Sequence, residues 1–280
     1  MRGAPTVFAK IHRGTPHPFS GCDSLGLGLI SSQASATLFG EPMNAAFLLA
    51  TWVCSQNPLP AVPEAVLPAA QRERAVAATA RVRIGDRPAA TAVAVGRDKG
   101  FLYLLTAAHV VEGADMSKLT LEFFTAGIRP ESAFTLRGAR AVVRRPIADL
   151  ALLQVPVDPE QAVAVLPLVP PNASPKRFPF EGVSVGCSHG EPPTCERETL
   201  LGKRLTVRRE DDVAFFWQAE KAQARGRSGG PLLDAEGRVV GVSTATSLGK
   251  GYYVHASEIH AALKTEGFDW LWKPTLPKPK

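Results

Sequence analysis

Short runs that mix apolar and polar residues dominate the chain from residue 76 to residue 264. Each run is rich in alternating or β-branched residues and ends near glycine, proline or aspartate, which is the pattern of short strands separated by turns. A helical pattern is clear only near the end, where we expect a short helix over 257–263 with Ser257 as its N-cap. The expected strands are 78–84, 90–95, 101–106, 119–124, 141–143, 150–155, 182–185, 205–207, 213–217, 239–243 and 252–254. Because no repeat of fixed period joins them, the sequence predicts an all-β sandwich or a pair of barrels.

The first 75 residues lack this strand pattern and are interrupted by prolines. An apolar run over 45–54 is too short to span a bilayer, but its length suits the hydrophobic region of a secretory signal. We therefore expect a poorly structured extension over 1–75, with a signal segment at 43–55 and a proline-rich linker at 57–68. If the signal operates, the protein is exported to the periplasm or the medium. If the run is an ordinary apolar segment, the protein is cytoplasmic.

The composition excludes several classes of protein. With 280 residues, 45% hydrophobic and 21% charged, the chain suits a globular fold with a sizeable core and not a disordered one. No run of 18 apolar residues occurs, so we expect no stable membrane span. The net charge is +6, but lysine and arginine are scattered and form no basic stripe of the kind that nucleic-acid binding needs. We expect no nucleic-acid partner.

The segment around Ser228 carries the strongest chemical signal. It reads Gly-Arg-Ser-Gly-Gly-Pro over 226–231, where a tight turn can expose the serine hydroxyl. A serine nucleophile needs a general base, and the base needs a third group to orient it. His109 lies at the end of an apolar strand in the segment TAAHV, and Asp149 begins the apolar segment DLALL. A carboxylate in apolar surroundings needs a hydrogen-bonding partner, for which an imidazole is well suited.

The serine motif also fits the G-x-S-x-G elbow of α/β-hydrolases. In that fold the serine precedes both the acid and the histidine, and strands alternate with helices. Here His109 and Asp149 precede Ser228, and the alternation is missing. The order of the motifs therefore argues against an α/β-hydrolase.

Taken in order, TAAHV, DLALL and GRSGGP resemble the trypsin/chymotrypsin superfamily of serine proteases, and in particular the bacterial HtrA-like trypsin-like peptidases. The resemblance covers residues 76–264. It implies two packed six-stranded antiparallel β-barrels with a short C-terminal helix, and a catalytic triad of His109, Asp149 and Ser228 in the cleft between the barrels. No segment of PDZ size follows residue 264, so we expect 265–280 to be a tail.

The resemblance also implies the parts that surround the triad. The backbone N–H groups of Gly226 and Ser228 would form the oxyanion hole. The strand after the nucleophile would line the substrate site with Ser243, Thr244 and Ala245, and Tyr253 would form another wall.

Arg227 departs from the pattern of the family. Members that are activated by cleavage carry aspartate before the nucleophile, and this aspartate pairs with the new N-terminus. An arginine cannot bind an ammonium group, so we expect no such activation. The sequence leaves open whether Arg227 faces solvent or pairs with a carboxylate.

Cys187 and Cys195 flank His189. A disulfide that closes a small loop, a zinc site and two independent thiols are all compatible with this spacing. No fourth ligand lies nearby, which disfavours zinc. We expect no metal and no cofactor.

The expected function is that of a serine endopeptidase, in which Ser228 forms an acyl-enzyme with a polypeptide substrate. The alternative is a catalytically silent trypsin-like domain that binds peptides or acts as a scaffold. The intact triad favours the enzyme, because a pseudoenzyme usually lacks one of the three residues. The sequence carries no signal for an oligomeric state.

Overall fold

The computed structural model describes residues 67–127, 129–209 and 212–273. Every described residue belongs to one compact unit within Pro58–Lys280. The predicted signal segment at 43–55 and most of the predicted linker lie outside the described residues.

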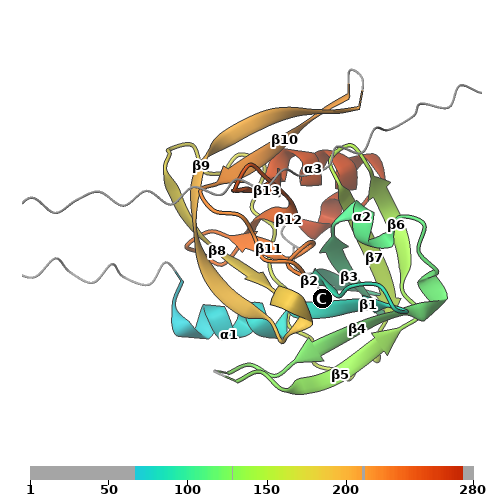
Figure 1. Ribbon diagram of the computed structural model, residues 1–280. Coiled ribbons are helices and arrows are strands. Elements are labelled where there is room, and N and C mark those ends of the chain that lie inside the picture. Colours follow the sequence, from blue (N-terminus) through green and yellow to red (C-terminus); the bar gives the residue numbers. More distant parts are fainter. Residues whose placement is uncertain (1–66, 128, 210–211, 274–280) are drawn as a thin grey trace, which may run out of the picture. The chain divides into compact units, whose positions relative to one another are not determined.

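The first sheet consists of antiparallel strands in the order β5-β4-β1-β2-β3-β7-β6 (Figure 1). Its two edge strands, β5 and β6, follow one another in the chain and are joined by Gly138 and Ala139 alone. The sheet must therefore curl until its edges approach each other. The strands are β1 (Thr79–Ile84), β2 (Ala90–Asp98), β3 (Phe101–Thr106), β4 (Leu119–Phe124), β5 (Ser132–Arg137), β6 (Arg140–Arg145) and β7 (Leu150–Pro156). Their buried side chains, among them Val82, Leu104, Leu121 and Leu153, form a core of their own.

The second sheet closes into a six-stranded barrel in the order β10-β13-β12-β11-β8-β9. Its strands are β8 (Phe180–Gly186), β9 (Thr194–Arg209), β10 (Asp212–Ala219), β11 (Pro231–Leu233), β12 (Val239–Ser247) and β13 (Lys250–His255). The apolar cluster within this sheet includes Leu200, Trp217, Leu232 and Tyr253.

The all-β fold class is confirmed, but the first sheet differs from the prediction. It has seven strands in an open order where six strands in a closed barrel were expected. The sequence did not predict β5, whose side chains are mostly exposed. It also did not reveal β11, which has three residues and begins at Pro231, the last residue of the serine motif.

Three α-helices, α1 (Ala69–Ala77), α2 (Ala108–Val111) and α3 (Ala256–Thr265), accompany the sheets in the described part, with 3₁₀ turns η1 (Met116–Lys118), η2 (Ser188–Gly190) and η3 (Asp269–Leu271). The N-cap of α3 is His255 and not Ser257 as predicted, because the His255 ring accepts a hydrogen bond from the Ser257 N–H at 2.9 Å. Burial lowers the pKa of His255 to about 3, so the ring stays neutral and keeps its acceptor nitrogen.

A shared apolar cluster joins the two sheets to α3. Val93 and Leu105 of the first sheet lie in the same cluster as Val183 and Val242 of the second, and Ile259 of α3 completes it. This packing brings the loops at the ends of β2, β3 and β7 close to the loop that leads into β11. His109 lies in the short helix α2 that follows β3, and Asp149 and Ser228 lie on the loops before β7 and β11.

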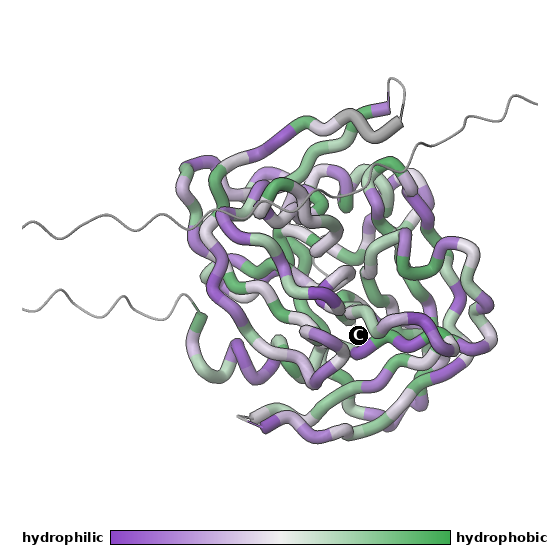
Figure 2. Tube along the Cα trace, viewed as in Figure 1, coloured by the Kyte–Doolittle hydropathy of each residue, from purple (hydrophilic) through white to green (hydrophobic). Residues whose placement is uncertain are grey.

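The folded domain extends beyond the predicted limits of 76–264 at both ends. Leu67 and Val76 are buried in the shared cluster, so α1 is part of the domain although the middle of this helix is hydrophilic (Figure 2). Leu271 is also buried, and a Cβ added to Gly96 would lie 2.2 Å from its side chain. The residues up to Leu271 are therefore a packed element and not a tail. Among the described residues, no helix is long and apolar enough to cross a membrane.

Candidate active site

His109 is held by Asp149 at the point where β3 turns into α2. The His109 Nδ1 atom lies 2.7 Å from Asp149 Oδ2. The His109 side chain is 47% exposed and that of Asp149 only 10%, so the pair joins a buried carboxylate to a ring that reaches the surface. A carboxylate at Nδ1 favours the tautomer with a proton on that nitrogen, which leaves Nε2 as an acceptor.

Asp149 lies between β6 and β7 in a backbone conformation that few residues adopt. Its φ is +54°, in the left-handed region, where aspartate and asparagine are among the better tolerated residues. Its carboxylate also accepts hydrogen bonds from the His109 backbone N–H at 2.8 Å and from the Thr244 hydroxyl. Burial by itself would raise the pKa of Asp149, but the hydrogen bonds from His109 and Thr244 outweigh it and lower the pKa. Asp149 therefore remains ionised beside the imidazole.

Ser228 is placed by contacts between its loop and the first sheet. The Thr91 N–H donates to the Ser228 carbonyl at 2.9 Å, and the Thr91 hydroxyl donates to the Gly226 carbonyl at 2.7 Å. Gly229 has φ +89°, and a Cβ there would lie 2.0 Å from the Thr91 carbonyl oxygen. Only glycine fits at this position. Ser228 and His109 line the same pocket of about 400 Å³.

The N–H groups predicted for the oxyanion hole have a suitable environment. Gly226 has φ +91°, and a Cβ there would lie 2.3 Å from the Cys187 carbonyl oxygen, so a side chain is excluded. In the described part of the chain, no hydrogen bond engages the backbone N–H of Gly226 or of Ser228. Both donors are thus available to a substrate, and their role stays a prediction.

The predicted substrate walls are arranged differently from the prediction. Ser243 and Thr244 are consecutive in β12, and both are buried, like the rest of this strand from Val239 to Thr244. A bulge lies between Ser243 and Ala245. The Ser243 hydroxyl donates to the Gln223 side chain. The Thr244 hydroxyl donates to the Asp149 carboxylate, which also binds the His109 ring. Ala245 is half-buried beyond the bulge.

Tyr253 is the second correction in this region. It is fully buried and donates to Glu198 Oε1 at 2.8 Å, so it does not line a surface that a substrate could reach. Alternation along β13 is the reason. It turns Tyr253 inward, whereas its neighbour Tyr252 is half-buried.

Cys187 and Cys195 are free thiols, so the disulfide considered from the sequence is not formed. Cys195 pairs across the strands with Val185, two residues before Cys187, and its thiol lies near the Arg72 carbonyl. Cys187 lies beyond the end of β8, where burial raises the pKa of its thiol to about 11. The described residues contain no group of three histidine, cysteine, aspartate or glutamate side chains that could hold a metal ion.

Residues 90–242 match the protein family described as the trypsin-like peptidase domain. The match begins in β2, ends in β12 and includes all three residues of the predicted triad. This chain belongs to the trypsin-like peptidase family.

The similar proteins are named as proteases, and several of them as DegP-like serine endoproteases. The domain is 30% identical over 151 residues to the magnetosome formation protease MamE of Magnetospirillum gryphiswaldense. The aligned region covers 53% of this chain and 18% of MamE. It is 29% identical over 163 residues to a DegP-like periplasmic serine endoprotease of Chlamydia trachomatis, which covers 56% of this chain and 30% of that protein. The chain therefore spans less than a third of the length of either relative.

A solved structure shares the fold. The active form of the Rv3671c protease from M. tuberculosis superposes with a TM-score of 0.55 and 22% identity, over 75% of this chain and 91% of that one. The trypsin-like fold assigned from the sequence is thus confirmed.

The sequence did not single out Thr91, and it predicted a different role for Thr244 in this trypsin-like peptidase site. Thr91 ties the nucleophile loop to the first sheet, and Thr244 holds the buried carboxylate. Thr91 lies in an ordinary alternating strand, and nothing in that pattern distinguishes it. For Thr244, the available signal was its place on the strand after the serine motif.

Proposed function

We propose that this trypsin-like peptidase domain is an active serine endopeptidase that hydrolyses peptide bonds of a polypeptide substrate. One observation carries the proposal: the His109 ring, bonded to buried Asp149, opens onto the same pocket as Ser228. Nucleophilic catalysis by a serine requires a general base near its hydroxyl, and a histidine that shares a pocket with the serine can supply that base.

In the proposed reaction, Ser228 Oγ attacks the carbonyl carbon of the scissile bond while His109 Nε2 takes its proton. The carbonyl electrons move to the oxygen, and the N–H groups of Gly226 and Ser228 stabilise the negative charge. His109 then gives the proton to the leaving nitrogen as the C–N bond breaks, which leaves an acyl-enzyme. Water repeats the sequence on the acyl carbon and restores the Ser228 hydroxyl. Asp149 stabilises the imidazolium formed in each half.

A fluorophosphonate probe tests whether the site is catalytically competent. We expect the folded protein to gain one phosphonyl group at Ser228, with loss of fluoride and of the hydroxyl proton, because only an activated serine attacks phosphorus at a useful rate. Intact mass and peptide mapping provide the measurement, and Ser228→Ala serves as the unlabelled control. A folded protein that gains no mass would instead support the silent peptide-binding domain.

We also propose that the protein is exported. Two observations support this: the apolar run over 45–54, and the DegP-like relative, which is named as periplasmic. A secretory signal is removed during export, so the mature protein in its native host should begin after about residue 53. Mass spectrometry of its N-terminus is the measurement. Full-length protein recovered from the cytoplasm would argue against export.

A further inference from the structure

Arg227, the residue directly before the nucleophile, is a buried charge. Only 1% of its side chain is exposed. A buried cation is unfavourable unless a carboxylate pairs with it and its N–H groups find acceptors. The groups that pair with the Arg227 charge and accept its N–H hydrogen bonds therefore hold this part of the loop in place.

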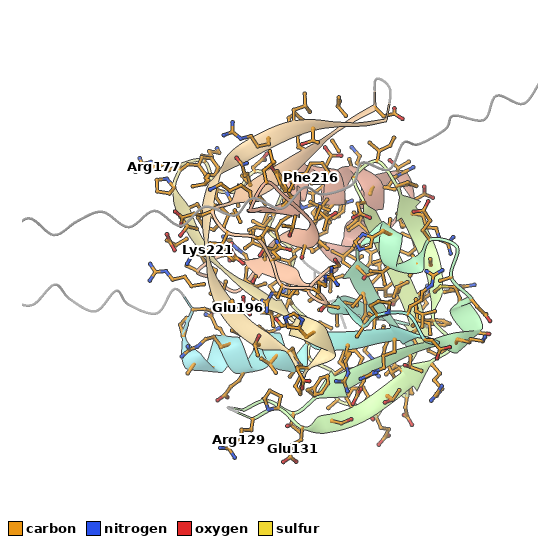
Figure 3. The ribbon with its side chains drawn as sticks, in the orientation of Figure 1. Arg129, Glu131, Arg177, Glu196, Phe216 and Lys221 are labelled. Carbon is orange, nitrogen blue, oxygen red and sulfur yellow. The ribbon has the colours of Figure 1, made fainter. Side chains whose placement is uncertain are left out.

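The guanidinium of Arg227 is bound by side chains from β8 and β9. Its Nη2 donates to Ser184 Oγ at 2.7 Å, and its Nη1 donates to Glu196 Oε1 at 2.8 Å. Glu196 lies on the first part of β9 (Figure 3), and its side chain is 48% exposed, so it keeps part of its hydration while it neutralises the cation. Longer contacts connect Arg227 to the Ser188 hydroxyl at 3.1 Å and to the Thr194 hydroxyl at 3.2 Å.

Packing holds the aliphatic part of the Arg227 side chain, and further hydrogen bonds hold the residues that bind its guanidinium. A Cβ added to Gly186 would lie 3.1 Å from both Cβ and Cγ of Arg227, so the side chain packs directly against the backbone of β8. The network continues from Ser184 to Glu198. The Glu198 carboxylate accepts a hydrogen bond from the Ser184 hydroxyl at 3.2 Å and another from the hydroxyl of buried Tyr253. Burial raises the pKa of Glu198, and these hydrogen bonds and the charge of Arg227 oppose that rise. The arginine is thus anchored in the interior of the closed barrel.

This anchor acts on the peptide planes that carry the oxyanion donors. A trans peptide points its C=O and its N–H in opposite directions, so a bond that fixes one fixes the other. The Arg227 carbonyl shares its plane with the Ser228 N–H and accepts from the Gly230 N–H at 2.8 Å. The Arg225 carbonyl shares its plane with the Gly226 N–H and accepts from the His189 N–H at 2.7 Å. Arg227 lies between these two planes, and its side chain binds the same β8–β9 connection that includes His189.

We propose that Arg227 is a positioning residue, whose buried bonds to Glu196 and Ser184 hold the Gly226–Ser228 backbone with both N–H groups directed at the substrate oxygen. This inference rests on the proposed function. In it, the domain needs no second chain or new N-terminus to order its nucleophile loop, because an internal ion pair does so.

The test compares Arg227→Met, which keeps the length of the side chain without its charge, with the milder Glu196→Gln. Arg227→Met should lower kcat by about 10²-fold, the usual effect of losing one oxyanion donor, while KM changes by less than about threefold. Glu196→Gln should lower kcat by about tenfold in the same pattern. A peptide aldehyde, whose adduct places an oxyanion in the hole, should bind more weakly by similar factors. If Arg227→Met does not fold, the same measurements of kcat, KM and aldehyde binding on Glu196→Gln and Arg227→Lys provide the test.

Arg238→Met is the matched control, because Arg238 forms an ion pair with buried Asp234 in the same sheet but outside the nucleophile loop. It should lower thermal stability and leave kcat and aldehyde binding unchanged. If folded Glu196→Gln or Arg227→Met keeps the wild-type kcat, or if each loses only stability as the control does, Arg227 does not position the loop.

An NMR measurement separates this inference from the proposed function. Glu196→Gln should shift or broaden the amide signals of Gly226 and Ser228, and Arg238→Met should not, even if the wild-type protein proves unable to hydrolyse peptides. An inert wild type with these shifts would reject the proposed function alone. An active wild type whose two amides do not respond would reject the role of Arg227 alone.

Discussion

Replacing Ser228 or His109 by alanine is expected to lower kcat by about 10⁴- to 10⁶-fold, and replacing both should lower it no further. Ser228→Ala removes the attacking oxygen but leaves the pocket and the N–H groups of the loop in place. His109→Ala leaves a hydroxyl that no nearby base can deprotonate. Because the two side chains serve one transition state, removing the second costs nothing once the first is absent. Steady-state hydrolysis of a chromogenic peptide by the two single variants and the double variant is the measurement.

The controls for this experiment are stability and an unrelated serine. Ser117→Ala removes an exposed hydroxyl that bonds only Asp115 among its described contacts, and it should keep the wild-type kcat. All variants should unfold near the wild-type temperature, because Ser228 and His109 both lie at the pocket surface. Losses that add in the double variant would mean that the two residues act independently, and the proposed triad would then be wrong.

Asp149→Asn is expected to lower kcat by about 10⁴-fold with little change in structure. The carboxylate accepts from the His109 ring, from the His109 backbone and from Thr244, and it holds the proton on Nδ1. An amide can donate to Nδ1 and so stabilise the tautomer with the proton on Nε2, which cannot act as a base. Asparagine tolerates the left-handed φ of +54° at least as well as aspartate, so a loss of kcat in this variant is not caused by backbone strain at residue 149.

Asp234→Asn is the matched control for the loss of a buried carboxylate. Asp234 is buried and pairs with Arg238 on the β11–β12 turn. Its replacement should leave kcat at the wild-type value, whereas Asp149→Asn should lower kcat by about 10⁴-fold. A fully active Asp149→Asn protein would show that Asp149 does not orient the base.

Much of the candidate site could be predicted because each part carries a local signal. His109 follows an apolar strand, Asp149 precedes one, and Ser228 lies among glycines, and the structure places all three where β2, β3 and β7 meet the loop before β11. Gly226 and Gly229 could be recognised as special from their motif. Their physical reason is visible only in the structure, where the Cys187 and Thr91 carbonyls occupy the space of a Cβ.

The limits of the domain and the walls of the pocket were harder to predict. The α1 segment contains charged residues in its middle, so its apolar ends gave no strong helical pattern, yet Leu67 and Val76 are buried. Thr244 was expected to line the substrate site because its segment resembles the strand that does so in the family. In the structure Thr244 lies at the bulge in β12, and its hydroxyl donates to the Asp149 carboxylate.

The sequence by itself determined the all-β class and the family, and it was enough to select His109, Asp149 and Ser228 as the predicted triad. Strand periodicity and short motifs depend on neighbours along the chain, which the sequence contains. Only the tertiary structure decided that Arg227 is buried against Glu196, that Tyr253 is internal and that Cys187 and Cys195 remain separate thiols. Each of these depends on strand register, bulges and partners from other strands. Burial and pairing of a polar group are properties of what packs around it, and residues distant in sequence supply those surroundings.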